Sequence, residues 1–123
     1  MEYMLVYLEP AEDFALRSDP KVGPQRMAAW ADYMGAMRAA GVMRGGNALQ
    51  PPHTTTTVRL RDGRRLVQDG PFADTREHLG GYVIIDVATL DDALAWAGRA
   101  PCNANGATQV IPVADMSAHM PAP

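Results

Sequence analysis

The apolar positions of this chain fall into short extended runs separated by polar segments. Met4 to Leu8 is apolar at every residue, which is typical of a strand buried on both faces. Gly80 to Val87 is the clearest strand, and Gln109 to Val113 predicts the last one. Thr54 to Leu60 is rich in β-branched residues, which also favour a strand. Residues 42–49 predict a weaker extended segment, broken by a glycine pair (Gly45, Gly46).

Two other segments have the period of amphipathic helices. Pro24 suits the start of the first helix, because a proline lacks only an N–H that would be unpaired there. Gly41 is expected to end this helix, whose apolar stripe consists of Met27, Trp30, Ala31, Met34 and Met37. Thr89 predicts the N-cap of the second helix, with acids in the first turn. Pro101 is expected to end that helix, and its apolar stripe is Leu90, Ala93, Leu94 and Ala97.

Asp62 and Gly63 predict a turn that joins Thr54–Leu60 to a strand from Arg65 to Gln68. A two-residue turn would place Leu60 opposite Arg65, whereas a three-residue loop would place it opposite Leu66. We favour the second register because an apolar pair packs better across two strands.

The order of these elements is strand, helix, strands, strand, helix, strand. This order predicts an α+β fold, a ferredoxin-like β-α-β-β-α-β sheet with both helices on one face and an inserted β-hairpin. We expect one domain over residues 1–115 and a C-terminal tail over residues 116–123.

Both faces of this sheet are apolar, although two helices can cover only one. Side chains alternate along a strand, so Val83, Ile85 and Val87 oppose Tyr82, Ile84 and Asp86. An open face with Leu5, Ile84 and several tyrosines would be a large apolar patch, which monomers rarely expose. We therefore predict a homodimer in which two sheets pack face to face. The alternative is that the tyrosines lie at a hydrated sheet surface.

Length, charge and cysteine content limit the partners and the cellular compartment that we expect for this protein. The chain has 123 residues, of which 47% are hydrophobic, and a net charge of −3, which favours neither nucleic acid nor a membrane as partner. Its one cysteine, Cys102, fits a reducing compartment. The N-terminal apolar run is too short for a signal peptide, and no segment reaches the length of a membrane span. We expect a cytoplasmic protein.

The segment from Val67 to Gly81 holds most of the candidate chemistry. Asp69 could close a turn through its carboxylate or act as a general acid or base. Histidine is a common general acid or base, and His78 is flanked by other polar candidates. Asp86 would have a raised pKa if the second sheet covered it. Asp69, His78 and Asp86 are therefore the candidate catalytic residues.

Phe72, Arg76 and Tyr82 are the candidate substrate-binding residues. We expect Phe72 to anchor its loop in the core, while Arg76 could bind a carboxylate or form a surface ion pair. The three histidines, His53, His78 and His119, lack ligand spacing, so no metal is predicted, and no cofactor motif occurs. An arginine cluster on the hairpin fits a solvated edge that resists aggregation, with nucleic-acid binding as the second interpretation: Arg59, Arg61, Arg64 and Arg65.

Several segments together resemble the DGPF branch of the YCII-related family. The signature itself is Asp69-Gly70-Pro71-Phe72-Ala73-Asp74-Thr75. The resemblance extends along almost the whole chain through Tyr3-Met4-Leu5, Gly41-Val42, Leu49-Gln50-Pro51-Pro52, Thr57-Val58-Arg59, Asp62-Gly63, Leu79-Gly80-Gly81-Tyr82, Ile85-Asp86-Val87 and Leu90 to Ala97.

The resemblance implies a dimeric α+β barrel of ferredoxin-like subunits. Some YCII relatives are thought to use a histidine–aspartate pair, one branch acts in the breakdown of chlorinated aromatics, and many DGPF proteins are encoded near sigma factors. Here no histidine precedes His53, and the last strand reads Gln109-Val110-Ile111-Pro112 where relatives often have Glu-Val-Arg-Pro. The relatives' catalysis is therefore not expected to transfer directly.

Two hypotheses for function follow. The leading one is a homodimer that binds a small organic molecule in an inter-sheet or sheet-edge pocket, with general acid/base chemistry at Asp69 and with His78 and Asp86 as secondary candidates. The alternative is a non-enzymatic accessory or regulatory protein of a sigma-factor system, in which the same loop only shapes a binding surface.

Overall fold

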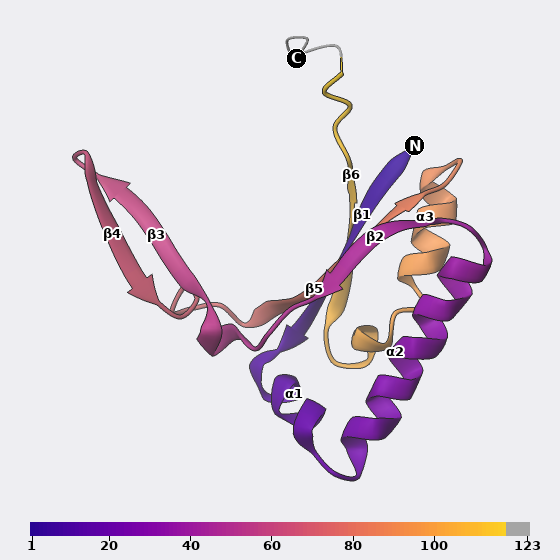
Figure 1. The fold of residues 1–123 in the computed structure, drawn as a ribbon, viewed down its shortest axis with the longest axis horizontal. Coiled ribbons are helices and arrows are strands. Elements are labelled where there is room, and N and C mark those ends of the chain that lie inside the picture. Colours follow the sequence, from indigo (N-terminus) through magenta and orange to yellow (C-terminus); the bar gives the residue numbers. More distant parts are fainter. Residues whose placement is uncertain (118–123) are drawn as a thin grey trace.

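A computed structural model describes residues 1–117 of the chain (Figure 1). The expected tail over residues 116–123, with His119, lies mostly outside this range. The strands are β1 (Glu2–Pro10), β2 (Met43–Ala48), β3 (Thr56–Arg61), β4 (Arg64–Asp69), β5 (Glu77–Asp86) and β6 (Ala107–Pro112). The α-helices are α1 (Ala11–Ala15), α2 (Val22–Ala39) and α3 (Leu90–Ala97), and short 3-10 turns occupy Leu16–Ser18, Pro52–Thr54 and Pro101–Ala104.

The predicted α+β ferredoxin-like architecture is confirmed. Four strands form one sheet in the order β2-β5-β1-β6, and every neighbouring pair is antiparallel. The long helices α2 and α3 lie on the same side of this sheet (Figure 1). The inserted β3–β4 hairpin is a separate two-stranded sheet. No helix among residues 1–117 has the length and apolar character that crossing a membrane requires.

The core lies between the helices and one face of the sheet. Tyr3, Leu5 and Tyr7 of β1 and Val83 and Ile85 of β5 are buried there, against Tyr33, Met37, Ala93 and Ala97 from the two helices. The expectation that Leu5 shares the open face with Ile84 was wrong. The antiparallel register sets Leu5 opposite Val83 and Met4 opposite Ile84. The open face, which we define as Met4, Val6, Leu8, Tyr82 and Ile84, is half-buried within one chain.

The helix α2 differs from its prediction in its start and in its buried side. It begins at Val22, before Pro24, where the Asp19 carboxylate accepts hydrogen bonds from the N–H groups of Lys21 and Val22. Met27, expected on the core stripe, is 71% exposed, whereas Tyr33 is buried. Tyr33 can be buried because its hydroxyl is hydrogen-bonded, a partner that hydropathy alone does not reveal.

The hairpin has the two-residue turn that we did not favour. Leu60 lies opposite Arg65 and Arg61 opposite Arg64. Asp62 and Gly63 both have positive φ, of 51° and 74°, as a type I′ turn requires. This turn matches the twist of two strands, and neither hairpin face is buried, so side-chain packing does not set the register.

The glycine pair expected to break the extended segment 42–49 lies inside the edge strand β2. A β-bulge between Met43 and Gly45 accommodates the extra residue Arg44. Gly46 is required by close packing, because a Cβ there would lie 2.5 Å from the Tyr82 carbonyl oxygen. The predicted cap of α3 is confirmed, since Thr89 Oγ1 accepts the Asp92 N–H at 3.1 Å.

Candidate functional site

A groove of about 570 Å³ runs between α2 and the strands β2 and β5. One wall is formed by Met27, Trp30 and Met34 of α2, of which Met27 is exposed and the other two are half-buried, and the opposite wall includes Met43 and Val83. This volume falls in the range of small-molecule sites, which are typically apolar with a few placed polar groups. Of the methionines predicted for the core, Met37 is buried there, whereas Met27 and Met34 line this groove.

Glu9 closes one end of the groove and is 4% exposed. Its Oε1 lies 3.3 Å from Arg26 Nη2, and its Oε2 lies 3.9 Å from Arg17 Nη2. Arg26 Nη2 also lies 3.8 Å from the carboxylate of Asp13, a second buried acid. Gly80 makes room for this arrangement, because a Cβ there would lie 2.8 Å from Glu9 Oε2.

Burial raises the pKa of the Glu9 carboxyl above its ordinary value, and the nearby Asp13 adds to that shift. The guanidinium groups of Arg17 and Arg26 oppose the rise but do not cancel it. A carboxyl whose pKa is raised can hold a proton at a higher pH than a surface glutamate, and this is the property that a general acid needs.

A cluster of aromatic rings supports the middle of the groove. Tyr7 lies edge-on to Trp30 with centroids 4.9 Å apart, and its hydroxyl is 2.9 Å from that of Tyr33. The Tyr33 hydroxyl donates to the Trp96 carbonyl at 3.1 Å, so Tyr7 is the donor in the tyrosine pair. Burial raises the pKa of both phenols, and they stay neutral. The cluster therefore holds Trp30 in place rather than supplying a proton to a ligand.

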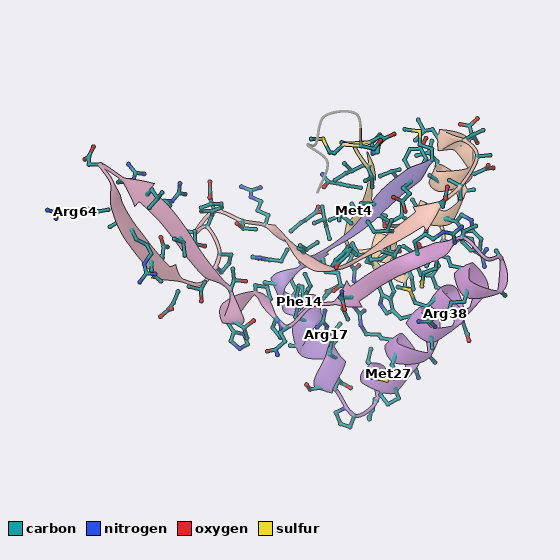
Figure 2. All side chains as sticks on the ribbon, turned by 45° about the horizontal axis from the view of Figure 1, so that its top comes forward. Met4, Phe14, Arg17, Met27, Arg38 and Arg64 are labelled. Atoms are coloured by element: carbon teal, nitrogen blue, oxygen red, sulfur yellow. The ribbon has the colours of Figure 1, made fainter. Side chains whose placement is uncertain are left out.

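Arg38 contributes a cation farther along the groove. It lies twelve residues after Arg26 on α2, which corresponds to about 18 Å along the helix axis. Figure 2 shows Arg17 near α1 and Arg38 on the C-terminal half of α2. Among residues 1–117, no carboxylate lies within 4.0 Å of the Arg38 guanidinium. The groove thus has a buried carboxyl with a raised pKa at one end, an apolar middle, and an available cation toward the other end.

The three candidate catalytic residues lie in different places. Asp69 is exposed at the end of β4, and the adjacent turn is held by Gly70, whose N–H donates to the Thr55 carbonyl at 2.6 Å. His78 is half-buried in β5, with its ring edge-on to Phe14, and lines a second hollow of about 460 Å³ with Pro71 and Thr75. In the strand register His78 lies opposite Glu9.

Asp86 lies at the other end of β5 from His78, about 26 Å away at the usual rise of a strand. Its Oδ1 is 2.9 Å from the N-terminal amine and its Oδ2 is 3.8 Å from Arg44 Nη2. The hydrogen bond and charge of the N-terminus hold the pKa of Asp86 below its ordinary value. The lowered pKa of Asp86 is opposite in direction to the raised pKa that we expected if a second sheet covered this residue. Within residues 1–117 Asp69, His78 and Asp86 thus lie apart from one another, and their catalytic roles stay predictions.

Of the three candidate binding residues, only Tyr82 borders the groove. Its hydroxyl accepts a hydrogen bond from Asn47 Nδ2 at 2.9 Å. Arg76 is exposed in the loop before β5. Phe72 does not anchor the loop in the core, as was expected. It is 52% exposed and stacks against Arg59, whose Cζ lies 4.6 Å from the ring centroid, because the loop continues a hairpin that projects from the body.

Glu9 and Arg26 were not predicted as site residues, although the position of each in its element carries a signal. Glu9 continues the alternation Tyr3, Leu5, Tyr7, so it has the phase of the buried side chains of β1. Arg26 precedes Trp30, Tyr33 and Met37 at helical spacing, the side of α2 that faces the sheet. In each element a charged residue occupies a position whose side chain is expected to face the core, and this signal could have identified the site from the sequence.

Comparison with known proteins adds a family. Residues 1–117 match the YCII-related domain. The uncharacterized protein R00369 of Rhizobium meliloti (strain 1021) is 41% identical over 73 residues, which are 59% of this chain. The aligned part covers 58% of that relative's length.

Proposed function

Because this chain belongs to the YCII-related family, we propose that its groove binds a small organic acid with an apolar body and that Glu9 acts there as a proton donor. One observation carries the proposal: a carboxyl with a raised pKa is buried at the end of an apolar groove, between two arginines. Buried groups with shifted pKa values in a concavity are characteristic of functional sites.

The ligand class follows from the positions of the charges. Arg38 would pair with the anionic group of the ligand, and Trp30 and Met34 would contact its apolar body. The other end of the ligand would then reach Glu9. An elongated acid with an aromatic or aliphatic body fits this order of groups better than a compact polar metabolite.

Binding can be measured through Trp30, because the chain has only two tryptophans. In a Trp96→Phe background, 4-phenylbutyrate should change the Trp30 emission in a saturable manner, and the neutral 4-phenylbutanamide should bind more weakly. Arg38→Gln should weaken binding of the acid about tenfold, since a charge-assisted hydrogen bond is lost.

Arg99→Gln is the matched control, because Arg99 lies over the Trp96 ring, outside the residues that line the groove. Equal binding of acid and amide, or an equal effect of the two arginine substitutions, would show that the groove does not select anions through Arg38.

We extend the proposal to the finer features expected from the sequence. His78, opposite Glu9 in the strand register, is the candidate that could take part in proton transfer with it. The Asp69–Thr75 segment supports membership of the DGPF branch, and a single cysteine supports a cytoplasmic location. The apolar open face supports a homodimer in which two sheets pack together.

A further inference from the structure

The β3–β4 hairpin exposes an apolar stripe that nothing in residues 1–117 covers. Val58 and Val67 lie opposite each other and Leu60 shares their face, and these side chains are 57%, 56% and 76% exposed. Beyond pairing with each other, the two strands make no extensive contact with another element of the described chain. An isolated two-stranded hairpin is marginally stable in water, so this stripe is suited to cover by another surface.

The charge of the hairpin differs in sign from that of the rest of the chain. The hairpin, residues 56–69, carries four arginines and two aspartates. The other residues carry seven basic and twelve acidic side chains. Arg61 and Arg64 are directly opposite each other, a like-charge pair that disfavours the hairpin unless acidic groups lie nearby. A second copy of this chain supplies an acidic body for each basic hairpin.

The position of the hairpin also fits a second copy. It leaves the body on the side of the sheet away from α2 and α3 (Figure 1), the side of the open face. Each hairpin strand has six residues, about 20 Å in length. A second subunit packed on the open face would therefore lie beside this hairpin.

We propose that the β3–β4 hairpin is an arm that packs against a second copy of the chain. The stripe of Val58, Leu60 and Val67 packs on the partner, and Arg65, which is paired with Leu60 on the same face of the hairpin, lies against the partner's acidic body. By two-fold symmetry each subunit both extends an arm and receives one. This assignment goes beyond the ligand groove and does not depend on it.

The test compares three substitutions by sedimentation velocity across a concentration series. Leu60→Asp should weaken the dimer at least about tenfold, because it places a charge in a buried contact. Ile84→Asp on the open face should weaken it as well. Leu94→Asp on α3 is the matched control and should leave the dimer unchanged, since Leu94 is exposed on the helix side. Replacing residues 57–68 by a short Gly-Ser linker, which keeps the core intact, should reproduce the Leu60→Asp result.

The position of the arm can be mapped by cross-linking. Arg64→Cys in a Cys102→Ser background carries a photo-cross-linker, and light and heavy isotope forms of the protein are mixed. Cross-links between light and heavy chains, from position 64 to the partner's body, are expected. The arm is overturned if cross-links form only within one chain, or if Ile84→Asp dissociates the dimer while Leu60→Asp does not. A monomeric wild-type protein overturns both the arm and the sheet dimer, with ligand binding in the groove unaffected.

Discussion

Glu9 shows how one residue can matter more through its position than through its type. It follows three buried side chains in the same phase of β1, so the strand carries it into the protein interior. Arg17 and Arg26 compensate only part of the loss of hydration, and the pKa of the carboxyl stays raised. The candidate acid is therefore produced by the alternation of a strand that is otherwise purely structural.

A raised pKa makes a signed prediction about stability. Glu9 stabilises the fold most below the unfolded-state pKa of about 4.3, and that contribution is lost as the pH rises toward the folded-state pKa. The free energy of unfolding of the wild type, relative to Glu9→Gln, should therefore fall as the pH rises through this range. Urea unfolding at a series of pH values measures this difference.

Asp86→Asn is the control with the opposite sign. The pKa of Asp86 is lowered, so its contribution is present above its unfolded-state pKa and is lost as the pH falls. The free energy of unfolding of the wild type, relative to that of Asp86→Asn, should rise as the pH increases through the acid range. If the free-energy difference between wild type and variant changed with pH in the same direction for both substitutions, the raised pKa of a buried Glu9 would be contradicted.

The glycines of β2 allow a matched comparison. Gly46→Ala should destabilise the protein by about 2 kcal/mol, because the added Cβ would overlap the backbone of β5. Gly45→Ala should have little effect, since no atom lies within 4 Å of the site of its Cβ. Denaturant unfolding of the two variants should separate them clearly. Equal losses would indicate that β2 pairs with β5 in a different register.

At the scale of elements, the sequence predicted those features that depend only on neighbouring residues. The continuous apolar runs of β1 and β5 and the Thr89 cap of α3 are properties of neighbouring residues, and all three were predicted. The buried side of α2 was predicted only in part: Met37 was expected in the core, but Tyr33 was not, because its burial depends on hydrogen bonds to residues distant in the sequence. The hairpin register was missed because turn conformation, rather than packing, determines it.

The α3 cap can be tested directly. Thr89→Ala removes the acceptor of the Asp92 N–H and should lower the free energy of unfolding by about 1 kcal/mol. Thr89→Ser retains the hydroxyl and should stay close to the wild type. Thermal and urea unfolding give the comparison, and a destabilisation by serine as large as that by alanine would argue against a capping role.

At the scale of the whole molecule, the open face and the hairpin make stability depend on concentration. If two copies associate only when folded, the unfolding temperature of the wild type should rise with protein concentration. Ile84→Asp should remove most of that dependence, because Ile84 lies at the centre of the open face. Differential scanning calorimetry over a wide concentration range tests this, and a constant unfolding temperature would count against the dimer.

The sequence by itself determined the order of the elements, the ferredoxin-like architecture and the excess of apolar surface, because periodicity and turn chemistry are local. Only the tertiary structure decided which residues meet. It placed Glu9 between Arg17 and Arg26, set Met27 on a groove while Met37 stayed in the core, and separated Asp69, His78 and Asp86. The physical reason is that pairing register and helix rotation arise from contacts between distant segments, and the phase of a single element does not specify them.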